Sequence, residues 1–145
     1  MNQISGKDVF RQQVFGDDSR RQFDACDPEQ AAVLDHNMLS HELLTLDALA
    51  KLGTALPAKS VEYNPGDLPV GIRPEDVPDN GMTIGDTIRT IDQSASWAVL
   101  KNIEQMPEYE ALLHGLLAEI RPILEAKTGQ MLKPQGFVFV SSPDA

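Results

Sequence analysis

The sequence predicts a mixed fold, α/β or α+β, in which helices alternate with short strands. Three observations predict it. Leucines between positions 45 and 57 recur at helical spacing, and three short apolar or alternating runs follow further along the chain. Two more segments open with residues that typically begin helices.

The first 30 residues form a polar N-terminal arm. We expect it to be partly helical and to pack through a few isolated apolar side chains, namely Val9, Phe10, Val14, Phe15 and Phe23. Residues 31–145 then form the α/β segment. A short apolar run, Ala31 to Leu34, predicts a strand at its start.

Thr45 opens the first clear helix, because its hydroxyl can accept hydrogen bonds from free backbone N–H groups. The leucine periodicity that follows stops at Pro57. Val61 and Tyr63 then flank Glu62, an alternation typical of a short strand.

Residues 64–81 carry four prolines and three glycines, which predicts a long loop. Evenly spaced aliphatic residues in this segment favour a loop that packs over the surface rather than a linker. They are Leu68, Val70, Ile72 and Val77.

Thr83 and Asp86 resemble a capping box and predict a short helix over 84–93. The apolar run from Trp97 to Leu100 predicts a buried strand.

Pro107 suits the first position of a helix, and Gly129 suits its end. We expect Pro122 to kink or divide this helix. The strand that follows, Phe137 to Val140, is strongly apolar and is expected to be buried. A wide apolar stripe marks the helix, made of Leu112, Leu113, Leu116, Leu117, Ile120 and Leu124.

Charge and composition exclude several classes of function. Twelve basic against 22 acidic residues give a net charge of −10, and the single basic pair, Arg20-Arg21, is surrounded by aspartates. Direct nucleic-acid binding is therefore disfavoured. The sequence has neither a secretory leader nor a membrane span, so a cytoplasmic location is expected. Cys26 is the lone cysteine and is interpreted as structural or incidental.

No catalytic, cofactor-binding or metal-binding residue is assigned from the sequence. His36 and His41 do not begin a His-x-Asp/Glu motif, and they are expected at the surface or in loops. His114 lies in the leucine stripe, where a partly buried histidine is expected.

Other short motifs are equally uninformative. Ser141-Ser142 lacks a matching His/Asp arrangement, and Lys127-Thr128-Gly129 fits the end of a helix. The acidic pairs Asp17-Asp18 and Glu75-Asp76 stand in polar surroundings and are interpreted as solvated surface charge.

Four stretches carry a family resemblance: His41 to Leu49, Val61 to Pro69, Trp97 to Asn102 and the closing Gly136 to Ala145. Together they resemble the N-terminal region of bacterial cupin-like proteins of the JmjC type, sometimes labelled transcriptional regulators. The resemblance spans roughly residues 31–145. It implies a flanking region that packs beside a cupin barrel, a double-stranded β-helix that is absent from this chain.

Relatives of that kind are oxygenases that depend on Fe(II) and 2-oxoglutarate. Their iron is held by a His-x-Asp after the strand that resembles Phe137–Val140, and by a later His; neither is present here. The resemblance therefore implies a non-catalytic framework for scaffolding, dimerisation or shaping a substrate entrance. Fe(II) and 2-oxoglutarate would belong to a longer protein, and the abrupt end after Pro143 suggests a truncation.

The alternative is a stand-alone acidic interaction module without enzymatic activity, which dimerises through the arm and the helix 107–128. The apolar stripe and the aromatic anchors suggest this, although both could instead fill the chain's own core. The expected partners are a second copy of the chain, or a protein partner or protein substrate of a longer form. No membrane partner is expected.

Overall fold

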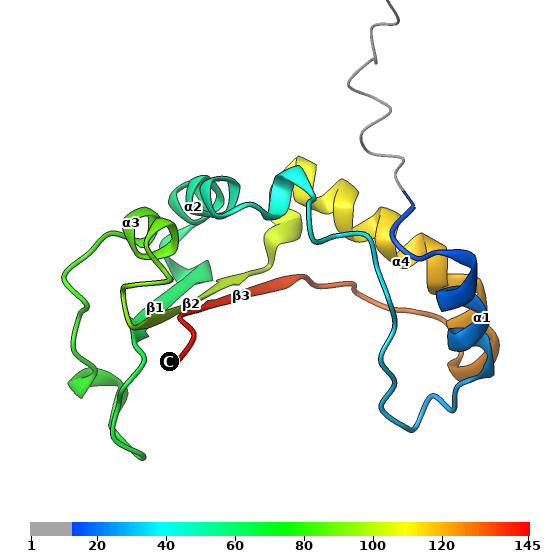
Figure 1. The fold of residues 1–145 in the computed structure, drawn as a ribbon, viewed down its shortest axis with the longest axis horizontal. Helices are drawn as coiled ribbons and strands as arrows, with labels where there is room; N and C mark the ends of the chain where they lie inside the picture. Colours follow the sequence, from blue (N-terminus) through cyan, green and yellow to red (C-terminus); the bar gives the residue numbers. More distant parts are fainter. Residues whose placement is uncertain (1–12) are drawn as a thin grey trace, which may run out of the picture.

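A computed structural model describes residues 13–145 and has an α+β architecture (Figure 1). Val9 and Phe10 of the expected arm lie outside these residues. Three antiparallel strands form one sheet in the order β1-β2-β3, so the alternation of helices and strands along the chain does not produce a parallel sheet. The elements are α1 (Asp17–Ala25), α2 (Leu46–Ala55), β1 (Val61–Pro65), α3 (Ile84–Arg89), β2 (Ser96–Lys101), α4 (Pro107–Thr128) and β3 (Phe137–Ser141).

One face of the sheet is buried under helices. Leu100 in the central strand β2 pairs with Val61 of β1 and Val138 of β3, and Ala98 pairs with Tyr63 and Val140 in the same way. Because side chains alternate along a strand, these residues point to a single face, and all belong to the hydrophobic core. Figure 1 shows α2 and α3 lying over this face at one end of the molecule.

Capping explains where two helices begin. Thr45 accepts a hydrogen bond from the backbone N–H of Ala48, and Thr83 accepts one from Asp86, as the sequence predicts. Helix α3 ends at Arg89, whereas the sequence predicts an end at 93. The Thr90 hydroxyl donates to the carbonyl of Asp86, and the chain turns there, yet it still buries Ile91 in the core.

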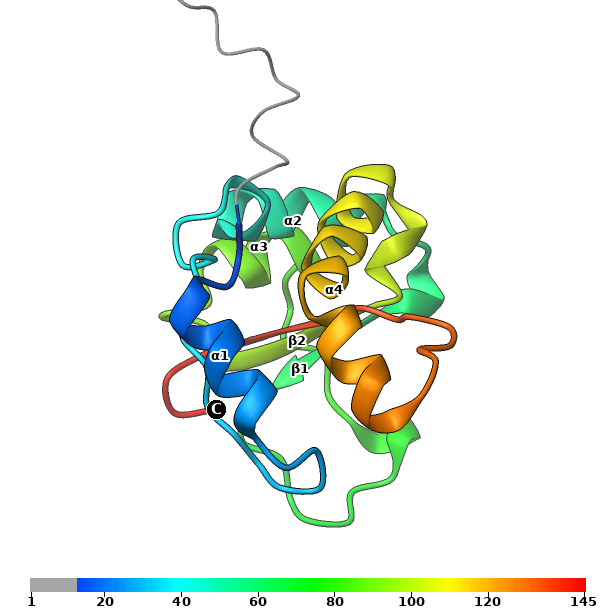
Figure 2. The ribbon, with the colours of Figure 1, turned by 90° about the vertical axis from the view of Figure 1, so that its right-hand side faces the viewer.

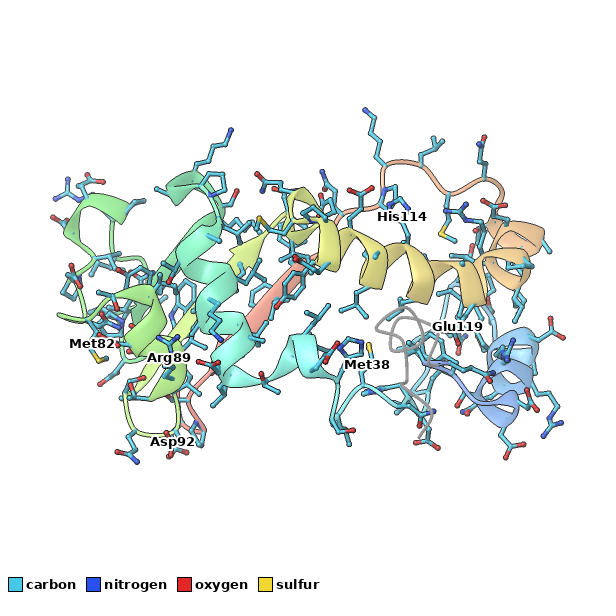
Figure 3. The ribbon with its side chains drawn as sticks, turned by 90° about the horizontal axis from the view of Figure 1, so that it is seen from above. Met38, Met82, Arg89, Asp92, His114 and Glu119 are labelled. Atoms are coloured by element: carbon cyan, nitrogen blue, oxygen red, sulfur yellow. The ribbon has the colours of Figure 1, made fainter. Side chains whose placement is uncertain are left out.

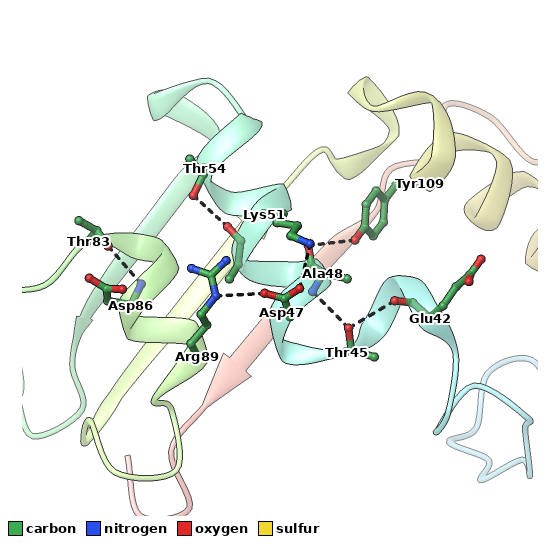
Figure 4. A network of polar contacts seen from close by, with 11 residues as sticks. Glu42, Thr45, Asp47, Ala48, Lys51, Thr54, Thr83, Asp86, Arg89 and Tyr109 are labelled. Carbon is green, nitrogen blue, oxygen red and sulfur yellow. Dashed lines mark hydrogen bonds and ion pairs between the residues drawn. The ribbon is translucent and has the colours of Figure 1, made fainter.

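A polar network joins α2 to α3 on the outer side (Figure 4). Asp47 of α2 accepts from Lys51 one turn later at 2.9 Å and from Arg89 of α3 at 3.2 Å. Both bonds lower the pKa of the Asp47 carboxyl, and the bond with Lys51 has the larger effect. All three side chains are exposed, so we attribute the close packing of α2 on α3 to the buried leucines and Ile88 beneath them.

The long helix α4 begins at Pro107 and ends at Gly129, both as predicted, but Pro122 does not divide it. Tyr109 is the buried residue of α4, and the six residues of the apolar stripe are all half-buried. Leu112 packs on the core, and Leu124 lines a contact with α1. The stripe thus serves the chain's own packing along much of its length.

The loop predicted over 64–81 begins later than expected, because Asn64 and Pro65 belong to β1. Residues 66–83 connect β1 to α3, with one short 3-10 turn at Pro74–Asp76. Leu68, Ile72 and Val77 are half-buried, whereas Val70 is fully exposed, so packing of this loop is only partial. The predicted strand at Ala31–Leu34 is wrong. This run has no partner strand, and Val33 is 87% exposed while its carbonyl accepts a hydrogen bond from Gln22.

The described part of the arm is partly helical, as expected, and α1 packs on the C-terminal half of α4 (Figure 2). Two charged side chains of α4 hold it. The Glu119 carboxylate accepts from the backbone N–H groups of Val14 and Phe15 at 2.9–3.0 Å. The Lys127 ammonium donates to three carbonyls at the other end of α1: Phe23, Asp24 and Cys26.

Candidate functional site: an open sheet face and its free edge

The three histidines lie on separate elements. The Nδ1 atoms of His36 and His41 each accept a backbone N–H two residues later, so both act locally, in a loop and at the start of a 3-10 turn. His114 is exposed, which corrects the expectation of partial burial, and it projects from the side of α4 opposite Glu119 (Figure 3).

No group of three or more His, Cys, Asp or Glu side chains within residues 13–145 is arranged to hold a metal ion. The donor set of these residues therefore does not fit the iron that the family resemblance implies. Within the same residues, no helix is long and apolar enough to cross a membrane.

The serine pair has a structural task. The Ser142 hydroxyl is buried, donates to the carbonyl of Ile91 and accepts from the backbone N–H of Ser96 at 3.0 Å. It thereby ties the end of β3 to the start of β2. A hydroxyl with both hydrogen-bonding roles occupied in this way has no general base beside it and is not arranged as a nucleophile.

The cysteine and lysine that sequence reasoning set aside meet at the contact of α1 with α4. There a cavity of about 220 Å³ is lined by Phe23, Leu34, Leu124 and both of these residues. Cys26 donates its thiol to the carbonyl of Phe23, and the Lys127 ammonium is occupied by three carbonyls. The polar groups of this cavity are thus satisfied internally and hold the arm in place.

The acidic pairs are surface charge, as interpreted from the sequence. Asp17 and Asp18 occupy the first turn of α1, where negative charge suits the helix dipole. Glu75 and Asp76 lie beside Arg73 in the loop.

The face of the sheet opposite the core exposes two aromatic side chains that internal packing does not cover. Its residues alternate with the core residues in the strand register: Phe139 lies beside Val99, and Phe137 beside Lys101. Phe139 is 75% exposed and Phe137 is 48% exposed. In Figure 1 the helices α2 and α3 lie on the other side of the sheet, and the loop after β1 with its short 3-10 turn hangs below the level of the sheet at one end. Burial of β3 is therefore one-sided, which corrects the expectation of a buried strand.

The start of β3 is held in place by hydrogen bonds to the segment that follows β2. Glu104, after β2, accepts the backbone N–H of Gly136 at 3.0 Å, and the Gly136 carbonyl accepts from Ile103. Burial raises the pKa of the Glu104 carboxyl, but hydrogen bonds from Gly136, its own backbone N–H and Asn102 together outweigh burial and lower that pKa. A charged Glu104 thus fixes the entry of β3.

The charges on this face are few and mutually compensated. Lys101 donates to Glu62 across the strands at 2.7 Å. The ten residues from Pro134 to Pro143 carry no charge at all. The β3 part of the face is therefore uncharged and carries two exposed aromatic side chains, on a chain that is strongly acidic as a whole.

Sequence reasoning found the strand but not its exposed side. The Phe-Val-Phe-Val run has apolar residues at every position, so period-2 alternation could not assign one face to solvent. The solvent-facing side of β3 could be assigned only from its place at the edge of the sheet beside β2, which the tertiary structure supplies.

Comparison with known proteins does not extend these observations. No family model, no curated protein and no solved structure matches the chain.

Proposed function

We propose that this chain is a non-catalytic framework segment of a cupin-like protein of the JmjC type. In this role it packs beside a barrel and serves as a scaffold, a dimerisation element or the rim of a substrate entrance. The observation that carries the proposal is the apolar face of the sheet, with Phe137 and Phe139 exposed next to a buried Val99. Large aromatic side chains grouped on one uncovered face are typical of a surface that another folded element covers.

The arrangement of polar groups supports a framework rather than a catalyst. The Ser142 hydroxyl, the Lys127 ammonium and the Glu119 carboxylate each hold one element against another. In the longer protein that we propose, iron and 2-oxoglutarate would be held by residues outside this chain.

The proposal is tested by assaying this chain with Fe(II), 2-oxoglutarate and candidate protein substrates. We expect no turnover of 2-oxoglutarate above that of the metal alone, and clear turnover would contradict the framework role. The native coding sequence after Ala145 provides the second test. A continuing frame with an early His-x-Asp would support the proposal, since that motif supplies two of the three iron ligands, whereas an immediate stop codon would refute it.

A stand-alone interaction module is the second candidate, and the same open face favours it. An immediate stop codon after Ala145 would select this candidate. Direct DNA contact is the weakest candidate because of the net charge of −10, and only salt-sensitive DNA binding would revive it.

A further inference from the structure

We infer that two copies of this chain associate by antiparallel pairing of β3 with its own copy about a two-fold axis at Phe139. This inference rests on the proposed function: it names the surface and the partner through which a dimerisation element would act. Its physical basis is the free edge of β3 in the described sheet.

Within residues 13–145, the free edge of β3 presents three backbone positions that have no hydrogen-bond partner. Ser142 donates its N–H to Ser96, and Gly136 accepts from Ile103, so the even-numbered residues of β3 bond to β2. In an antiparallel pair these roles alternate along the strand. The N–H and C=O groups of Phe137, Phe139 and Ser141 therefore point away from β2, toward the open edge.

The two edges of the sheet differ in how they resist pairing. On β1 the outward positions include Pro65, which has no N–H to donate, and Glu62 carries a charge beside them. Proline and charge are the usual protections of an edge strand. The β3 edge has neither, because every residue of Phe137–Ser141 is uncharged and none is proline.

The strand is self-complementary in a register centred on Phe139. In that register Phe139 faces its counterpart in the second copy, and Phe137 faces Ser141. All outward N–H and C=O groups of both copies are then paired, and the sheet becomes six-stranded. The two Phe139 rings lie side by side on the open face, where aromatic cross-strand pairs stabilise a sheet. A two-fold axis also closes the assembly at two copies.

Charge favours this edge over the other surfaces of the chain. Two copies that each carry −10 repel one another, so contact is favoured at a neutral surface. Lys133 precedes β3 and Asp144 follows it. Antiparallel pairing brings the start of one strand to the end of the other, and hence brings these opposite charges to the same side of the interface.

The first experiment measures molar mass by sedimentation over a range of protein concentrations. We expect the unmodified chain to dimerise and Phe139→Lys to weaken dimerisation at least about tenfold, because the substitution sets two like charges opposite each other. Val70→Lys is the control, since it also replaces an exposed apolar residue by lysine, but away from β3, and should leave dimerisation unchanged. Circular dichroism checks that both variants remain folded.

The second experiment tests the register by cross-linking. In a Cys26→Ser background, Phe139→Cys places two thiols in a hydrogen-bonded pair whose Cα atoms lie about 5.5 Å apart, which suits a disulfide. We expect rapid formation of a disulfide-linked dimer under mild oxidation, and slow formation with Val70→Cys in the same background.

Three outcomes would overturn the inference: a strict monomer at all concentrations, a dimer that tolerates Phe139→Lys, or equal cross-linking at 139 and 70. The second outcome would move the interface elsewhere, with the half-buried stripe of α4 as the next surface to test. None of these outcomes bears on the turnover assay or the coding sequence, so failure of the dimer and failure of the proposed function are distinguishable.

Discussion

At the residue scale, Tyr109 joins the start of α4 to the start of α2. Its ring is buried in the core, and its hydroxyl donates to the carbonyl of Leu43 at 2.7 Å. The carbonyl of Ala48 lies 3.4 Å from the same hydroxyl (Figure 4). Helix α4 is thereby fastened to the segment that leads into α2. Burial, assisted by the nearby Glu108 charge, raises the pKa of the Tyr109 hydroxyl.

This shift gives stability a pH dependence of known sign. Because the pKa is raised in the folded state, the contribution of Tyr109 is fully present below the ordinary tyrosine value of about 10. It is lost as pH rises above that value, through the folded-state pKa.

We therefore expect Tyr109→Phe to lower the free energy of unfolding by about 1 kcal/mol at neutral pH, through loss of the hydrogen bond. Above pH 10 the stability of the variant should also decrease less steeply than that of the unmodified chain, because a phenylalanine side chain cannot ionise. Urea titrations at pH 8 and above pH 10 measure both effects. Tyr63→Phe is the control: no hydrogen bond of the Tyr63 hydroxyl is found in residues 13–145, so an equal loss there would contradict the assignment.

At the element scale, α4 contains two exposed prolines in different positions. Pro107 occupies the first turn, where the missing N–H has no helical partner to lose. Pro122 lies in the interior, where an N–H would otherwise donate to the carbonyl four residues earlier. The helix continues through Pro122 because neighbouring turns and the contact with α1 support it.

We expect Pro122→Ala to raise the free energy of unfolding by about 1–3 kcal/mol, because it restores the helical hydrogen bond. Pro107→Ala should leave stability nearly unchanged, and it serves as the control for the loss of a proline. Thermal unfolding of both variants tests this, and equal shifts would mean that position within the helix is irrelevant.

The attachment of α1 to α4 is the second feature at this scale. Glu119 and Lys127 lie a little more than two turns apart on α4 and hold the two ends of the α1 segment. Both bond to backbone groups rather than to side chains, so the contact depends on α1 being folded. Lys127 also places positive charge at the C-terminal end of α1, which its dipole favours.

Removing this lysine should loosen α1 alone. We expect Lys127→Met to speed hydrogen exchange of the α1 amides by about 10–100-fold, since hydrogen bonds from a charged group contribute about 1.5–3 kcal/mol. Exchange in the three strands should stay unchanged. Arg121→Met, which removes only a long 3.9 Å ion pair with Glu125, is the control. A uniform increase across the whole chain would contradict a local attachment.

At the scale of the whole molecule, acidic charge and the neutral β3 edge act in opposition. Self-repulsion of two chains that each carry −10 weakens association, while the edge and the open face favour it. Salt screens the repulsion but has little effect on backbone hydrogen bonds and apolar contact.

Dimerisation should therefore tighten as salt rises. We expect the dimer dissociation constant to fall several-fold between 50 and 500 mM NaCl, because the Debye length shortens from above about 10 Å to below about 8 Å over this range. Sedimentation at fixed protein concentration measures it. Weaker association at high salt would indicate an interface built on ion pairs instead.

Local sequence signals are sufficient to predict most helices and strands of this protein. Thr45, Thr83, Pro107 and Gly129 mark helix boundaries through cap geometry and φ preferences that act within one turn, and the structure has each boundary where it was predicted. The three strands of the sheet are predicted from apolar or alternating runs of three to four residues that begin at 61, 97 and 137, and the structure has a strand at each of them.

The tertiary structure decided everything that depends on pairing. In the structure the sheet is antiparallel and Ala31–Leu34 has no partner strand. His114 is exposed, and α4 continues through Pro122. The tertiary structure also turned Phe137 and Phe139 to the uncovered face and left the β3 edge free. The physical reason is that caps and turns are set by neighbouring residues, whereas strand partners and burial depend on residues far apart in the chain.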